Sequence, residues 1–71
     1  MTEKTKRLSL FERLRSQRLS LGLTQRQVSD ELGLDRSYLS KIERGLIIIN
    51  YLSYRKLSNF YKSFIPFEYE D

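Results

Sequence analysis

Residues 22–45 read GLTQRQVSDELGLDRSYLSKIERG, and this stretch predicts two short helices joined by a tight turn. Val28 and Leu32 lie one helical turn apart and give the first helix an apolar stripe. Gly33 is expected to end that helix, because glycine adopts the left-handed conformation at little cost. The second helix is expected to begin at Asp35, a favourable N-cap residue. So short a connection forces the two helices to a sharp angle, which is the geometry of a helix-turn-helix.

The second of these helices, residues 35–44, has two chemically different faces. At about 100° per residue, Leu39 and Ile42 point together with Tyr38 beside them, so these three are expected to dock the helix. The opposite arc has hydroxyl and basic side chains and no acid: Arg36, Ser37, Ser40, Lys41 and Arg44. A solvated face usually mixes both signs of charge. The arc is therefore either an ordinary solvated surface or a set of donors for DNA bases and phosphates.

Further helices are expected over residues 9–21 and 50–64. Two pairs of residues have capping-box spacing and mark helix starts: Ser9 with Glu12, and Thr24 with Gln27. The expected inward faces are Leu10, Phe11, Leu14, Arg18 and Leu21 in the former helix, and Tyr51, Tyr54, Leu57, Ser58 and Tyr61 in the latter.

These elements predict an all-α fold, a compact domain of four to five helices that spans residues 1–71. Residues 1–8 are expected to form a basic N-terminal arm, residues 24–44 the helix-turn-helix, and residues 65–71 a short C-terminal tail.

The amino-acid composition excludes several classes of function. The chain has 13 Lys and Arg residues against nine Asp and Glu residues. Residues 1–67 contain all 13 of the basic residues and only six of the acidic ones, which gives this part a net charge of +7. Such an excess of positive charge attracts phosphate backbones, but a charge of this size can equally serve only to keep the protein soluble. The chain has no cysteine and no histidine, and it shows neither a paired-acid arrangement nor a glycine-rich phosphate loop. We therefore expect that the protein is not an enzyme and binds no metal or cofactor. The sequence also shows no apolar stretch long enough to span a membrane and no signal peptide, so we expect a cytoplasmic protein.

Residues 22–45 together with their flanks resemble the lambda-repressor/Cro-like (XRE-type) family of helix-turn-helix transcriptional regulators. The resemblance covers about residues 10–62 and rests on Gly-Leu-Thr-Gln, a small residue at Ser29, Gly33, and the ending Ile-Glu-Arg-Gly. The stretch LDRSYLSKIERG is also similar to the controller proteins of restriction–modification systems. The family implies a lambda-repressor-like fold in which the helix of residues 35–44, the third along the chain, lies in the DNA major groove.

The resemblance also implies roles for single residues. Arg36, Ser37 and Lys41 match the positions that reach base edges, with Tyr38 at the groove margin. Gln25 matches a phosphate contact that steadies the reading helix. Further contacts with the DNA backbone are implied for Ser40, Arg44, Arg26, Lys6 and Arg7. Arg18 and Glu43 match a pair that forms an internal salt bridge.

Two segments depart from the family pattern. The loop after the third helix reads LIIIN over residues 46–50, where a polar loop is usual, and the chain ends without a full fifth helix. Surplus apolar residues there either complete the thin core or form a dimer interface: Ile47, Ile48, Phe60, Phe64, Ile65 and Phe67.

The sequence thus indicates a DNA-binding transcriptional regulator, and a dimeric repressor that occludes its promoter on a pseudo-palindromic operator is the favoured form. The alternative is a DNA-binding antitoxin or another protein-interaction module of the same fold, which would use the surplus apolar residues to bind a protein partner. A bacterial or phage origin follows from the resemblance.

Overall fold

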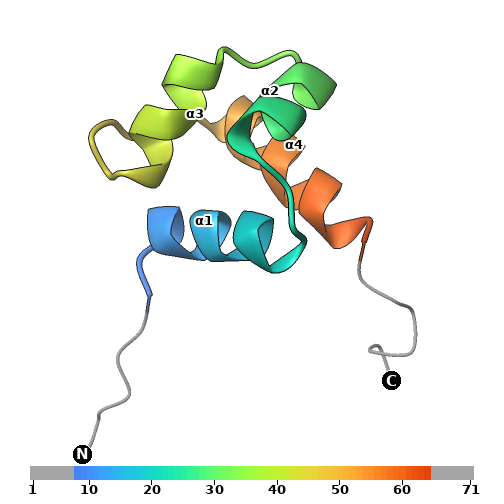
Figure 1. Ribbon diagram of the computed structural model, residues 1–71. Coiled ribbons are helices and arrows are strands. Elements are labelled where there is room, and N and C mark those ends of the chain that lie inside the picture. Colours follow the sequence, from blue (N-terminus) through green and yellow to red (C-terminus); the bar gives the residue numbers. More distant parts are fainter. Residues whose placement is uncertain (1–7, 65–71) are drawn as a thin grey trace, which may run out of the picture.

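The computed structural model describes residues 8–64, which form four helices joined by short turns (Figure 1). The helices are α1 (Leu10–Ser20), α2 (Gln25–Leu32), α3 (Arg36–Glu43) and α4 (Tyr51–Lys62). The expected all-α helix-turn-helix fold is confirmed. The expected arm and tail lie outside the described residues, apart from residue 8.

Local signals start three of the helices as expected. The Ser9 and Thr24 side chains accept hydrogen bonds from the main-chain N–H groups of Glu12 and Gln27, and both capping boxes are complete. Asn50 caps α4 by accepting from the Ser53 N–H at 2.8 Å. These caps satisfy main-chain donors that no preceding helical carbonyl can reach.

The cap expected at Asp35 is only partly present. The backbone of Asp35 is extended, as an N-cap requires, but its carboxylate makes no capping hydrogen bond. Its ψ of 130° is well below the 161° to 168° at the other three caps, so the side chain and the first N–H groups of α3 are not aligned.

The turn between α2 and α3 bends where glycine permits it. Gly33 has φ 70° and ψ 31°, a left-handed conformation, and both its N–H and that of Leu34 donate to the Ser29 carbonyl. Ser29 is buried and small, so the two helices cross closely there. In Figure 1 the turn lies at the top of the molecule, with α1 beneath α3 and beside α4.

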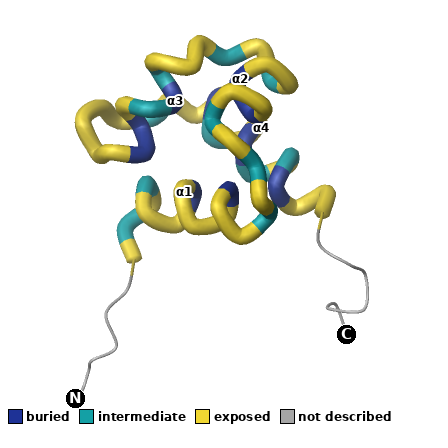
Figure 2. The backbone as a smooth tube through the Cα atoms, viewed as in Figure 1, coloured by how far each residue is buried: buried dark blue, intermediate teal, exposed yellow. Residues whose placement is uncertain are grey.

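One core holds the helices together, and it takes residues from all four (Figure 2). Its buried members are Leu14, Val28, Leu39, Ile42, Leu57 and Tyr61. The loop that follows α3 lies outside this core and is exposed along most of its length. None of the helices in residues 8–64 is long and apolar enough to cross a membrane.

Two expected core residues are exposed instead. Tyr51 is 66% exposed because the buried face of α4 is centred between Leu57 and Tyr61, roughly 100° around the helix from Tyr51. Its hydroxyl accepts a hydrogen bond from Arg55 at 3.0 Å, and the guanidinium lies over its ring. Leu10 is 45% exposed at the first residue of α1, where it lines an apolar hollow beside the loop after α3.

Candidate nucleic-acid interface

The outward face of α3 presents three of the four side chains for which the resemblance implied a role in base reading. Arg36, Ser37 and Lys41 are exposed, and within residues 8–64 their side chains make no hydrogen bond or ion pair. The opposite side of α3 is fixed, because Leu39 and Ile42 are at most 1% exposed. The polar arc is therefore held on a rigid support with its donors available to a ligand.

Tyr38 belongs more to the support than to the exposed arc. It is half-buried against the core, and its hydroxyl accepts a hydrogen bond from the Asn50 N–H at 3.4 Å. Tyr38 thus ties α3 to the start of α4. Ser40 is half-buried, and Arg44, the C-cap of α3, is exposed with its Nε donating to the Ser40 carbonyl at 3.4 Å.

Arg18 and Glu43 form the internal pair that the resemblance implied. Arg18 Nε donates to Glu43 Oε2 at 2.8 Å and Nη2 donates to Oε1 at 2.9 Å. The remaining Nη1 donates to the Leu23 carbonyl at 2.7 Å. The hydrogen bond with Glu43 raises the pKa of Arg18 above its ordinary value against the opposing effect of burial. This pair joins α1 to the last residue of α3.

Gln25 makes a contact that sequence reasoning missed. Its Nε2 donates to Glu43 Oε1 at 3.0 Å, the same oxygen that accepts from Arg18. The side chain expected to contact a phosphate is therefore already fixed by a hydrogen bond within the protein. No spacing signal could have indicated the contact, because it joins residues on different helices whose crossing sets their separation.

The first turn of α2 contributes Arg26, which is exposed beside the turn into α3. A hollow of about 390 Å³ there is lined by Arg26, Ser29, Asp30, Leu34, Asp35 and Arg36. Two acidic residues thus lie close to two basic residues that are expected to contact DNA. The outward arc of α3, taken alone, contains no acidic residue. Lys6 and Arg7, also expected at the DNA backbone, lie outside the described residues.

The residues expected at a dimer interface fall into two separate places. Ile47 and Ile48 lie in the loop after α3 and line an apolar hollow of about 250 Å³ with Leu10 and Phe11 of α1. Phe60 lies in the last turn of α4 and Phe64 just after the helix, with their rings edge to face and the ring centroids 5.2 Å apart. Both lie beside Leu23 and the outer side of α2. We call the exposed residues Leu10, Leu46, Ile47 and Ile48 the loop surface, and Leu23, Phe60 and Phe64 the α4 surface. Ile65 and Phe67 lie outside the described residues.

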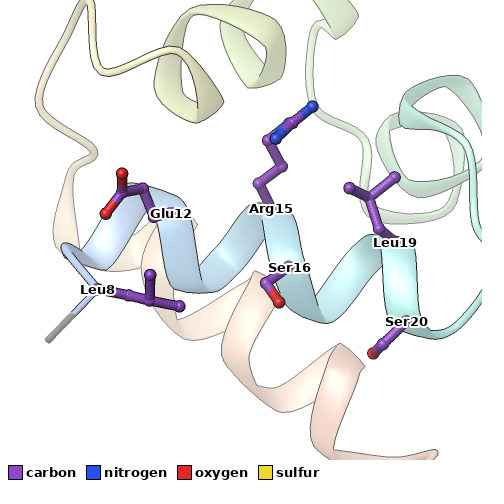
Figure 3. A pocket seen from close by; sticks show the side chains of 6 residues that line it. All are labelled: Leu8, Glu12, Arg15, Ser16, Leu19 and Ser20. Atoms are coloured by element: carbon purple, nitrogen blue, oxygen red, sulfur yellow. The ribbon is translucent and has the colours of Figure 1, made fainter. Parts of the chain in front are cut away.

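A further open hollow of about 550 Å³ lies along α1 (Figure 3). Its lining comes from α1 and the residue before its cap: Leu8, Glu12, Arg15, Ser16, Leu19 and Ser20. Glu12 is the one acid there, and it completes the cap of α1 with Ser9. Within residues 8–64 no three acids gather as a possible metal site. The arrangement of donors on α3 is thus the chemically distinctive surface of the described chain.

Comparison with known proteins agrees with this geometry. Residues 14–63 match the family model described as helix-turn-helix, which covers all of α2, α3 and α4 and most of α1. No curated protein and no solved structure matches the chain significantly. Since the family model spans more than half of the chain, the protein belongs to the XRE/lambda-repressor-like family of helix-turn-helix DNA-binding regulators.

Proposed function

We propose that the protein is a sequence-specific transcriptional regulator that binds a pseudo-palindromic operator as a dimer and represses by occluding the promoter. The third helix, α3, enters the major groove. One observation carries the proposal: the outward donors of Arg36, Ser37 and Lys41 have no partner within residues 8–64, while the other side of the same helix is fully packed. Such a regulator works in the cytoplasm of a bacterium, on the chromosome or on phage DNA.

Base reading and phosphate binding are divided among these side chains. Arg36 is suited to a forked contact with guanine, worth about 1–3 kcal/mol of discrimination, and Ser37 and Lys41 donate to neighbouring base edges. Phosphate contacts supply affinity without sequence preference, and we assign them to Gln25, Arg26, Ser40, Arg44, Lys6 and Arg7.

The loop surface is the proposed dimer contact. Ile48 is 93% exposed, an unusual position for an isoleucine, and it stands at an apolar hollow that is open beside it. In a contact with two-fold symmetry, Ile48 of each copy can enter the hollow of the other copy. The loop surface then forms both sides of the interface. The loop surface also follows α3 directly, so pairing through it would fix the separation of the two reading helices.

Selection of bound duplexes from a random pool tests the proposal. The expected result is one two-fold-symmetric motif. Arg36→Ala should relax the preference at one base pair in each half-site, whereas Gln25→Ala should weaken binding evenly across sequences. Arg55→Ala is the matched control, because it removes the same charge from α4, where the guanidinium is already engaged with Tyr51. Recovery of no motif would contradict direct base reading.

The alternative function, a DNA-binding antitoxin, is supported by one observation. Phe64 is 46% exposed beside the half-buried Leu23 and Phe60, and a dimer formed through the loop surface leaves this α4 surface open. A neighbouring gene whose product stops growth, and whose toxicity this chain relieves but its Phe64→Glu variant does not, would favour that function.

A further inference from the structure

Three helices meet at the carboxylate of Glu43. Glu43 is the last residue of α3, Arg18 lies on α1, and Gln25 is the first residue of α2. Oε2 of Glu43 accepts from Arg18 Nε at 2.8 Å, and Oε1 accepts from both Arg18 Nη2 at 2.9 Å and Gln25 Nε2 at 3.0 Å. Glu43 is only 3% exposed, so bulk water does not compete for these contacts.

The carboxylate determines which way the Gln25 amide faces. A carboxylate can only accept hydrogen bonds, so the nitrogen end of the amide must turn toward Glu43. That nitrogen has two hydrogens, and the contact with Glu43 uses one of them. Gln25 is half-buried, and within residues 8–64 its amide makes no other hydrogen bond. One donor of Gln25 is thus held in a single orientation and remains free.

The main chain next to this donor is oriented for an anion. The N–H of Gln27 is taken by the Thr24 hydroxyl at 3.0 Å, but those of Gln25 and Arg26 have no partner within residues 8–64. These groups lie at the N-terminus of α2, where the helix dipole favours negative charge. A DNA phosphate bound by the Gln25 amide would therefore lie close to these main-chain donors, since all of them belong to the first two residues of α2.

We infer that Glu43 is a positioning residue for DNA binding: it holds the Gln25 amide in the orientation that receives a backbone phosphate and does not touch DNA itself. This inference rests on the proposed function and deepens it. A purely structural role for Glu43 needs only its pair with Arg18. The contact with Gln25 adds pre-organisation, because a side chain fixed before binding loses less conformational freedom when the phosphate arrives.

The test compares the effect of Gln25→Ala in two backgrounds. Removing Glu43 alone leaves Arg18 as a buried unpaired charge, so the second background replaces both partners together, Arg18→Met with Glu43→Leu, and leaves the net charge unchanged. Circular dichroism melts establish that this background is folded at the temperature used. The probe is a duplex of mixed sequence and about 20 base pairs, since a phosphate contact needs no particular operator.

In the parent chain Gln25→Ala is expected to weaken duplex binding about tenfold, the value of one hydrogen bond to a charged group. In the Arg18→Met/Glu43→Leu background the same change should weaken it less than about twofold. Arg44→Ala removes a proposed phosphate contact whose side chain donates to the Ser40 carbonyl and not to Glu43, so it should cost the same factor in both backgrounds. An equal loss from Gln25→Ala in both backgrounds would overturn the inference and leave the proposed function standing.

A measurement on the unaltered protein needs no folded variant. Nuclear magnetic resonance of the side-chain amides should find the Gln25 NH₂ ordered in the free protein, in contrast to the exposed Gln17 on α1. Equal mobility of Gln25 and Gln17 would overturn the inference. If the parent chain does not bind the duplex at all, the proposed function fails and the inference fails with it, even where the Gln25 amide is ordered.

Discussion

The guanidinium of Arg18 and the carboxylate of Glu43 join two helices through a pair of hydrogen bonds of 2.8 and 2.9 Å, although the residues are 25 positions apart in the chain. Both side chains are almost completely withdrawn from solvent, at 9% and 1% exposure. The pair thus ties α1 to the last residue of α3 in a domain whose core is small.

Arg18→Ala is expected to lower the free energy of unfolding by about 3–5 kcal/mol, because it leaves the Glu43 carboxylate buried without its cation. Since small domains have little stability to lose, the variant should be largely unfolded at 37 °C. Arg18→Met combined with Glu43→Leu should recover most of the loss. Urea unfolding followed by circular dichroism measures both, and an unchanged midpoint for Arg18→Ala would mean that the pair contributes nothing.

Substitutions at two glycines separate backbone strain from steric clash. Gly33 and Gly45 have φ of 70° and 73°, so alanine at either residue costs about 1–2 kcal/mol for the left-handed conformation. A Cβ at Gly33 meets no atom within 4 Å, whereas a Cβ at Gly45 would lie 2.8 Å from Cζ of Phe11. Gly45→Ala should therefore destabilise by about 1 kcal/mol more than Gly33→Ala. In a Phe11→Ala background that excess should vanish, and its persistence would contradict the clash.

The hydroxyl of Tyr61 predicts a loss of stability at alkaline pH. Tyr61 is 2% exposed, and burial, followed by the charge of Glu43, raises its pKa from 10.0 to about 12. Below pH 10 both the folded and the unfolded chain keep this proton. Between about pH 10 and 12 only the folded chain keeps it, so the free energy of unfolding falls as pH rises.

Tyr61→Phe should remove that dependence. Within residues 8–64 the buried Tyr61 hydroxyl has no hydrogen-bond partner, so the variant should also be as stable as the parent at pH 8, or more stable by about 1 kcal/mol. Melting curves at pH 8 and pH 11 should give a larger advantage to Tyr61→Phe at pH 11. The two proteins differ at this hydroxyl alone, so an advantage that does not change with pH would contradict the assignment.

Charges placed on the two apolar surfaces identify the dimer contact. Ile48→Glu should abolish the dimer in sedimentation at micromolar concentration and leave the monomer folded, because the side chain is 93% exposed. Phe64→Glu, at a residue 46% exposed on the α4 surface, is the matched control and should leave the dimer intact. The reverse outcome would transfer the interface to the α4 surface, and a monomeric parent would refute the proposed dimer.

The fold could be predicted from the sequence because the signals that start and end its helices are local. The capping boxes at Ser9 and Thr24 need residues only three positions apart, and the bend at Gly33 needs one glycine. The inward face of α4 was harder to predict, because apolar spacing alone did not show where the centre of that face lies, and Tyr51 was wrongly placed on it.

Tertiary geometry decided what sequence spacing could not. Whether the Asp35 side chain caps α3 depends on the backbone angle ψ at this residue, and the residue type alone does not determine that angle. The contact of Gln25 with Glu43 joins residues 18 positions apart on two helices, and only the angle between these helices brings them together. The separation of the loop surface from the α4 surface likewise follows from the path of the chain, since all their residues are simply apolar in the sequence.

The two sides of α3 have consequences for how such a protein changes over evolutionary time. Leu39, Ile42 and Glu43 anchor the helix, and within residues 8–64 none of the outward side chains of Arg36, Ser37 and Lys41 takes part in that anchoring. Substitutions on the outward arc can therefore accumulate with almost no effect on folding. A gene duplicate could exchange these three residues in a few steps without passing through an unfolded intermediate, and an engineer could vary them in one combinatorial library.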